Sequence, residues 1–313
     1  MKRRTKQVIA VVVVLAVLLA LAYFGQSDRS MRFGTARIGG VYYTFGKELK
    51  EILSSEGVKL NIKETAGSAA NLRLLSGNTI QLAIAQTDVL YDAWTGTALF
   101  EGEKLQGYSA VAGLYTEACQ IVTAADSGIQ SIRDLQGKKI SIGEKESGTE
   151  QNAKQILLAY ELTEDMLEEV SMNYSEAAEA LEKGEIDAFF YTGGAQSAMV
   201  DELAQKIGLR LLSVEGKEKE NLLSSYQYYF PCTIPAGTYL GQDTEVETIG
   251  VRPVLLVSNK VKKDVVRKIT KALYQHVQEL QAGIPTKLSL SEEEIPVPLH
   301  KGAEEYYNSV RSS

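Results

Sequence analysis

Residues 32–55 read RFGTARIGGVYYTFGKELKEILSS, a short apolar strand pattern, a glycine-rich turn and an amphipathic helix pattern. The segment Arg32–Ile38 predicts a strand, and Phe45, Leu49, Ile52 and Leu53 recur at helical spacing on one face of a helix over Tyr43–Ser55. A strand that feeds directly into a helix is the repeating unit of an α/β fold.

The same unit recurs downstream. A first series continues with a strand in KLNIKET, a helix from Ser68 to a stop at Gly77, a strand in IQLAIAQ and a helix in TDVLYDAW. We expect Ser68 to cap the N-terminus of its helix. A second series follows EACQIVTAAD, with strands in KKISIGE, EEVSMNY, IDAFFYTGG and LRLLSV separated by helical patterns. Later, TIGVRPVLLVSN predicts one long buried strand, and KKDVVRKITKALYQHVQEL and LHKGAEEYYNSV predict helices. Two α/β units of this kind predict a two-lobed clamp with a cleft between the lobes.

Composition narrows the class of protein. The chain has 313 residues, 44% of them hydrophobic and 23% charged, which is typical of a folded protein with two average domains. Its net charge is −7, and the four cations before Val8 contribute +4, so the rest of the chain carries −11. Such an acidic balance excludes nucleic acid as a partner, because nucleic acid requires a basic surface.

The N-terminus predicts export. Four cations in MKRRTKQ precede seventeen uncharged residues, Val8–Phe24, which is the pattern of a signal peptide or a membrane anchor. Tyr23 and Phe24 do not make a good cleavage site, so we favour an uncleaved anchor over residues 1–30 that holds the protein on the outer side of the cytoplasmic membrane.

The turns at the carboxyl ends of the strands are the candidate site, because ligands of open α/β sheets collect there. Gly34 and Gly39 have the spacing of a phosphate-binding loop, but Gly40 and Val41 stand where that loop needs lysine and a hydroxyl residue. Backbone N–H groups at a helix start bind carboxylates without a cationic side chain. Four such turns, two from each series, predict a cleft lined by N–H and hydroxyl donors that faces a small anionic molecule. Each turn taken alone is also explained by helix capping or by a tight turn with buried tyrosines.

Catalysis is not predicted. The sequence has no G-x-S-x-G elbow, no cysteine–histidine pair and no H-E-x-x-H motif, and its acidic runs are typical of solvated faces. His276 and His300 are too few and too scattered for a zinc site, so we expect no catalytic residues, no metal and no cofactor.

Several segments together resemble one family, the TAXI-type solute-binding proteins of tripartite ATP-independent periplasmic (TRAP) transporters. In the order of that family they are GGVYYTFG, GSAANLRLLSG, AIAQTDVLYDAWTG, ADSGIQSIRDLQGKKISIGEKESGT, EIDAFFYTGG, IPAGTYLGQDTEVETIGVR and PLHKGAEEYY.

The resemblance implies a type II periplasmic-binding-protein fold, in which two α/β lobes joined by crossing strands close on a ligand that a TRAP permease then takes up. It implies a first lobe from residues 31–118 and 232–313 and a second from residues 119–231. It also implies a glutamate-like amino acid or a C4–C6 dicarboxylate as the ligand.

Matched turn by turn, the resemblance gives the candidate ligand-binding residues. They are Gly40, Val41, Tyr42, Tyr43, Gly67, Ser68, Asn71, Gln86, Asp88, Ser147, Gly148, Thr149, Tyr191, Thr192 and Gly193.

Departures from the family pattern leave questions open. Ala36, Arg37 and Ile38 replace the usual glycines and threonine, and Thr44 replaces a proline. Arg37 supplies a cation at the mouth of the cleft or is a solvated charge at a strand end, and we favour the second interpretation. The resemblance places Cys119 and Cys232 near the crossing strands, which raises the hypothesis of a disulfide across the hinge.

Two other functions remain open. The clamp could report its ligand to a separate signalling protein, or it could be an enzyme on the same fold, for example a dehydratase.

Overall fold

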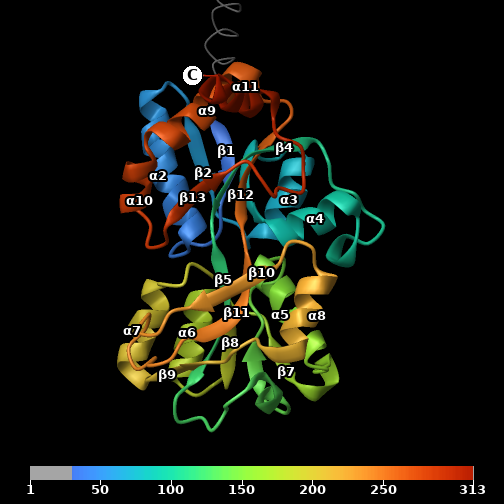
Figure 1. The fold of residues 1–313 in the computed structure, drawn as a ribbon, viewed down its shortest axis with the longest axis vertical. Coiled ribbons are helices and arrows are strands. Elements are labelled where there is room, and N and C mark those ends of the chain that lie inside the picture. The colour runs from blue at the N-terminus through green and yellow to red at the C-terminus, as the bar shows by residue number, and fades with distance from the viewer. Residues whose placement is uncertain (1–29, 313) are drawn as a thin grey trace, which may run out of the picture.

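The computed structural model describes residues 30–312, so the predicted signal peptide or anchor lies outside the described residues. Two lobes lie one above the other, each a β-sheet with helices on both faces (Figure 1). This arrangement confirms the expected pair of α/β lobes. Between residues 30 and 312, no helix is both long and apolar enough to cross a membrane.

The first sheet has six strands in the order β13-β4-β12-β3-β1-β2. Their bounds are β1 Met31–Gly34, β2 Leu60–Lys63, β3 Leu82–Gln86, β4 Tyr108–Tyr115, β12 Pro253–Ser258 and β13 Leu288–Ser291. The strands of the first strand–helix series, β1, β2 and β3, pair in parallel, as that series predicts. β12 and β4 then add antiparallel pairs on the other side of β3.

Helices cover both faces of this sheet. Their bounds are α2 Val41–Ser55, α3 Ser68–Ser76, α4 Thr87–Thr95, the 3₁₀ helix η1 Ala98–Phe100, α9 Lys263–Gln275, α10 Val277–Ala282 and α11 Lys301–Arg311. The first apolar core lies under α2, α9 and α11, and it contains Phe33, Phe45 and Leu49 at zero exposure. A second core, which includes Leu72 and Leu90, lies under α3 and α4 on the opposite face.

The second sheet has seven strands, six of them in the order β10-β11-β5-β8-β6-β7, with β9 paired to β5. Their bounds are β5 Glu117–Ala124, β6 Lys139–Ser141, β7 Glu168–Val170, β8 Ala188–Gly193, β9 Leu209–Leu211, β10 Phe230–Ile234 and β11 Val246–Val251. β6 pairs in parallel with β7 and β8, and β5, β9, β10 and β11 are antiparallel to their neighbours.

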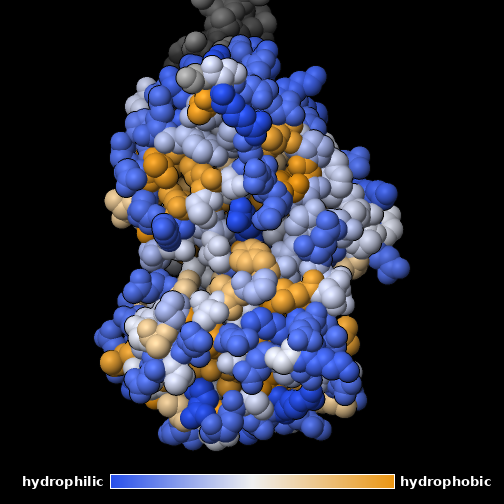
Figure 2. Space-filling model, in the orientation of Figure 1, coloured by the Kyte–Doolittle hydropathy of each residue, from blue (hydrophilic) through white to orange (hydrophobic). Residues whose placement is uncertain are grey.

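Helices also cover both faces of the second sheet. Their bounds are η2 Ile132–Leu135, α5 Gly148–Ala159, η3 Glu164–Met166, α6 Tyr174–Glu182, α7 Ala198–Ile207 and α8 Gly216–Ser225. One core lies between the sheet and α5 and α8, and another lies between the sheet and α6 and α7. Figure 2 shows the molecule narrowing between the lobes, with a largely hydrophilic surface on the face in view.

The chain crosses between the lobes twice. β4 ends at Tyr115 and β5 begins at Glu117, and on the return β11 ends at Val251 and β12 begins at Pro253. The prediction of one long strand over TIGVRPVLLVSN is therefore wrong, since its two halves pair in different sheets. Proline at the first position of β12 marks the break, because it has no N–H to donate to a ladder.

The predicted lobe boundary at residue 231 falls inside β10, and both β10 and β11 pair within the second sheet. We propose instead that the second lobe extends from residue 117 to residue 251.

The structure contradicts the disulfide hypothesis. Cys119 and Cys232 are both free thiols. β11 lies between the strands that carry them, so their backbones are about 9–10 Å apart at the usual spacing between strands. A disulfide needs Cα atoms closer than about 7 Å.

Candidate functional site

A cavity of about 130 Å³ lies between the two lobes, close to the crossing strands. It is large enough for a small solute, since a single water needs only about 10–15 Å³ by a comparable measure. Turns from both lobes line it, and twelve of the fifteen candidate residues are among them: Gly40, Val41, Tyr42, Gly67, Ser68, Gln86, Ser147, Gly148, Thr149, Tyr191, Thr192 and Gly193. The strand-to-helix turns that the sequence indicated are thus brought together.

The α2 turn supplies backbone donors. Gly40 precedes the helix in an extended conformation, and no side chain of the described residues caps this helix. The first N–H groups of an α-helix have no partner within the helix, so those of Val41 and Tyr42 are available where both residues line the cavity. Tyr42 is 7% exposed and its hydroxyl points to the first residue of β5, Glu117, at 3.1 Å.

The α3 turn is used differently from the prediction. Gly67, at φ +127°, is the residue before the helix, so Ser68 is not its N-cap. The Ser68 hydroxyl instead accepts a hydrogen bond from the Gln86 N–H at 3.1 Å. The N–H groups of Ala69 and Ala70 donate to the carbonyl of Glu146 in the other lobe, each at 3.2 Å. This helix start therefore binds the opposite lobe.

The α5 turn forms the facing edge. The Ser147 hydroxyl accepts from the Glu150 N–H at 3.0 Å and caps the helix. Thr149 shares a 2.5 Å hydrogen bond with the Tyr174 hydroxyl, which donates to the carbonyl of Thr192 at 3.0 Å. The rings of Tyr174 and Tyr191 meet edge to face, with centroids 4.6 Å apart, and they form an aromatic wall of the second lobe.

Three candidate residues do not line the cavity. Tyr43 follows Tyr42 by one position, and each helical residue turns the side chain by about 100°. Asn71 is fully buried, and its amide donates to the carbonyls of Thr35 and Ile84 at 2.7 and 2.8 Å. Asp88 in α4 accepts from the Asn152 amide of α5 at 2.6 Å, which is a contact between the lobes.

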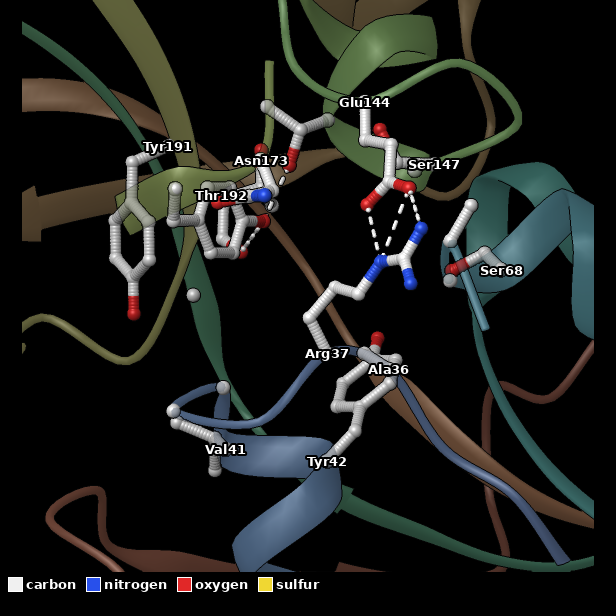
Figure 3. A pocket seen from close by; sticks show the side chains of 18 of the residues that line it. Ala36, Arg37, Val41, Tyr42, Ser68, Glu144, Ser147, Asn173, Tyr191 and Thr192 are labelled. Atoms are coloured by element: carbon white, nitrogen blue, oxygen red, sulfur yellow. Dashed lines mark hydrogen bonds and ion pairs between the residues drawn. The ribbon is translucent and has the colours of Figure 1, made fainter. Parts of the chain in front are cut away.

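Arg37 lies at the mouth of the cavity and remains exposed to solvent. Its guanidinium binds Glu144 of the second lobe, with Nε donating to both carboxylate oxygens at 3.1 and 3.0 Å (Figure 3). The side chain is 53% exposed, as the favoured interpretation of a solvated charge predicts, and it also reaches across the mouth of the cavity to an acidic partner in the other lobe. The carboxylate raises the pKa of Arg37 by hydrogen bonding.

The cavity lining contains residues that the sequence did not single out. Glu117 and Tyr174 are the most consequential, and the others are Ala66, Glu144, Asn173, Ser175, Ser197 and Met199. Glu117 is 2% exposed, and burial raises its pKa to about 8 despite hydrogen bonds from Gln86 and Tyr42. A lone acidic residue between the apolar runs VAGLY and ACQIV is the signal that could have identified it.

Two further chemical features of the described residues concern metal-ligand clusters and reactive thiols. Among residues 30–312 no cluster of histidine, cysteine, aspartate and glutamate could hold a metal ion. Burial raises the pKa values of Cys119 and Cys232, so neither thiol is an activated nucleophile.

Solved structures share the architecture. The malate-bound MatC protein of Rhodopseudomonas palustris has a TM-score of 0.58 at 12% identity, covering 91% of this chain and 98% of that one. Tv2483 bound to L-arginine has a TM-score of 0.53 at 14% identity, covering 84% and 94%. The alkanesulfonate-binding protein SsuA of Xanthomonas axonopodis pv. citri, bound to MOPS, has a TM-score of 0.50 at 15% identity, covering 90% and 91%.

At such low identities these likenesses concern the fold, and they confirm the periplasmic-binding-protein fold expected from the sequence. A family model matches residues 33–309, which is nearly the whole described part of the chain. The chain belongs to the NMT1-like family.

Proposed function

We propose that this protein is an extracytoplasmic receptor that binds a small anionic or zwitterionic solute and delivers it to a TRAP permease. The observation that carries the proposal is the cavity between the lobes, which turns from both lobes line. A ligand held there contacts both lobes at once, so its binding free energy favours the closed arrangement.

The donors in the cavity support a carboxylate as part of the solute. The uncapped start of α2 and the start of α5 present N–H groups and positive helix-dipole ends to the same cavity. Malate and L-arginine, the molecules bound by two proteins of the same fold, both carry a carboxylate. A glutamate-like amino acid and a C4–C6 dicarboxylate both satisfy these donors.

Delivery to a TRAP permease rests on the TAXI resemblance of the seven sequence segments. Location outside the cytoplasm rests on the cationic and apolar pattern of residues 1–30. We propose that this segment tethers the receptor to the membrane and that the cleft performs no catalysis.

A thermal-shift screen of the full-length chain against amino acids, 2-oxo acids and C4–C6 dicarboxylates tests solute binding. A ligand at 100 times its dissociation constant should add about 2.7 kcal/mol to the free energy of unfolding. The proposal fails if no solute of the panel raises the melting temperature, and turnover of the bound solute would favour an enzyme.

The permease is tested separately, in vesicles that contain the candidate TRAP permease. Uptake of the identified solute should require the receptor and an ion gradient, and it should proceed without ATP. Uptake that depends on ATP hydrolysis would assign the receptor to another class of transporter.

A further inference from the structure

Glu117 is a buried carboxyl group at the floor of the cavity. It is the first residue of β5, directly after the chain crosses from the first lobe. Its Oε2 accepts hydrogen bonds from the Tyr42 hydroxyl at 3.1 Å and from the Gln86 amide at 3.3 Å. Both partners belong to the first lobe, so Glu117 lies where the lobes and the cavity meet.

No protein cation neutralises this carboxyl group. Among the described residues that line the cavity, Arg37 is the one cation, and it is bonded to Glu144. An ionised carboxylate without a counter-ion is costly to bury, which is the first cause of the raised pKa of Glu117. In this closed arrangement the protein groups alone therefore leave Glu117 largely protonated at neutral pH.

The positions still open around Glu117 are acceptor positions. Tyr42 and Gln86 already direct donors at its Oε2. The amide oxygen of Gln86 is buried and has no hydrogen-bond partner within residues 30–312. Glu117 has no cationic partner among the described residues, although the Tyr115 hydroxyl is a further donor near its carboxyl group. A group that brings several N–H donors and a positive charge satisfies both needs, and an ammonium group has three such donors.

The other walls of the cavity are suited to a negatively charged group. The N-terminal ends of α2 and α5 offer N–H groups to a carboxylate, as described above. A site with a negative group at its floor and helix starts at its walls matches a molecule that carries both an ammonium and a carboxylate.

We infer that Glu117 binds the ammonium group of the ligand, so that the site takes a zwitterionic amino acid in preference to a dicarboxylate or a 2-oxo acid. The inference rests on the proposed solute-binding function and selects between the two solute classes which that function leaves open.

Matched pairs of ligands test the inference. L-Glutamate and 2-oxoglutarate differ only at the α-carbon, where a carbonyl oxygen of the 2-oxo acid replaces the ammonium group and hydrogen of the amino acid, and other amino acids have corresponding 2-oxo acids. In titration calorimetry with the full-length chain, the tightest solute should be an amino acid. Its 2-oxo acid should bind about 10- to 100-fold more weakly, the value of one or two charge-assisted hydrogen bonds.

Proton release on ligand binding is a second test, because no proton would be released if Glu117 had only a structural role. Binding of an ammonium group ionises Glu117, so close to one proton should leave per ligand at pH 7, measured from binding enthalpies in phosphate and Tris buffers. The other titratable groups around Glu117 are Tyr42, Tyr115, Cys119, Tyr174 and Tyr191, with raised pKa values, and Asp88. Glu117→Gln should abolish the release and weaken binding about 10- to 100-fold, whereas Asp88→Asn should leave the release in place.

The outcomes separate the two proposals. Tightest binding by an amine-free acid, proton uptake on binding, or a folded Glu117→Gln variant with unchanged affinity would each overturn the role of Glu117 and leave solute binding intact. If no amino acid, 2-oxo acid or dicarboxylate binds, the proposed function fails, and this inference fails with it.

Discussion

Glu117 and Cys119 lie two positions apart on β5, and burial governs the chemistry of both side chains. In a chain with 40 acidic residues, the apolar runs on either side of Glu117 indicate a buried position, but they do not show that this carboxyl group lies at a cavity. The buried position of Glu117 at the cavity arises from tertiary structure, because the chain crosses between the lobes at Thr116 and carries Glu117 into the interior.

Replacing Glu117 with glutamine should change how stability depends on pH. The pKa of Glu117 rises from its ordinary value of 4.5 to about 8 on folding, so the native state holds this proton more tightly than the unfolded state. The contribution of Glu117 to the free energy of unfolding of the closed protein should therefore decline as pH rises from about 5 to about 8 and level off above that. Glu117→Gln should remove the part of the decline that Glu117 causes, and its advantage over wild type should grow with pH up to about 8 in urea denaturation.

Asp88→Asn is the matched control, because burial raises the pKa of Asp88 to about 7. Its advantage over wild type should level off at a lower pH than that of Glu117→Gln. Parallel stability curves for wild type and Glu117→Gln between pH 5 and 8.5 would contradict the assignment of a buried, raised carboxyl group at this position.

The two cysteines should behave as free thiols in an oxidising compartment. After unfolding without reductant, alkylation should add two alkyl groups to the intact mass, because β11 separates the strands that carry Cys119 and Cys232. In the native protein Cys119, at 1% exposure, should react much more slowly than Cys232. An intact mass that gains no alkyl group without reductant would show that the strands rearrange to form a disulfide.

At the scale of the elements, local patterns predicted most strands and helices correctly. Apolar residues at helical spacing placed the start of α2 to within two residues, and the helix expected from Ser68 begins there as α3. The break between β11 and β12 at Arg252 could not be predicted from local patterns. An apolar run has the same pattern whether its residues stay in one sheet or pass from one sheet to another. The turns that line the cavity could be predicted from the sequence. Glu117 and Tyr174 could not be predicted as lining residues, because their exposure depends on how the lobes pack.

Gly148 shows how closely two elements from different lobes approach. A Cβ atom on this residue would lie 1.7 Å from the amide oxygen of Gln86 in β3. Gly148 does not have a positive φ, so alanine fits the backbone of α5 and meets an obstacle only from the other lobe. Gly148→Ala should therefore weaken ligand affinity about 5- to 150-fold, from an overpacking cost of about 1–3 kcal/mol in the closed arrangement.

The melting temperature of the ligand-free Gly148→Ala variant should stay close to that of wild type, since the clash is confined to the closed cleft. Gly77→Ala, at the end of α3 and away from the cavity, is the control and should retain wild-type affinity. An unchanged affinity for Gly148→Ala would show that ligand binding does not bring α5 and β3 this close.

At the scale of the whole molecule, the contacts between the lobes lie on both sides of the cavity. Arg37 and Glu144 bind across the mouth, and Arg73 pairs with Glu146 at 3.0 Å. Asp92 accepts from Gln151 at 3.1 Å farther along the interface. The ion pairs are partly exposed, and such pairs contribute about 0–1 kcal/mol each to stability. They therefore favour one relative orientation of the lobes but are too weak to hold the lobes closed.

Closure should therefore depend on the ligand. In small-angle scattering, the ligand-free chain should have a larger radius of gyration than this closed structure, and saturating ligand should reduce it. Arg37→Ala combined with Glu144→Ala should leave the contracted form in place and weaken affinity by about 5-fold or less, with a coupling free energy below about 1 kcal/mol in a double-mutant cycle. A ligand-free protein that already matches the closed structure, and that opens when the pair is removed, would show that the ion pair closes the lobes; the ligand would then select no conformation.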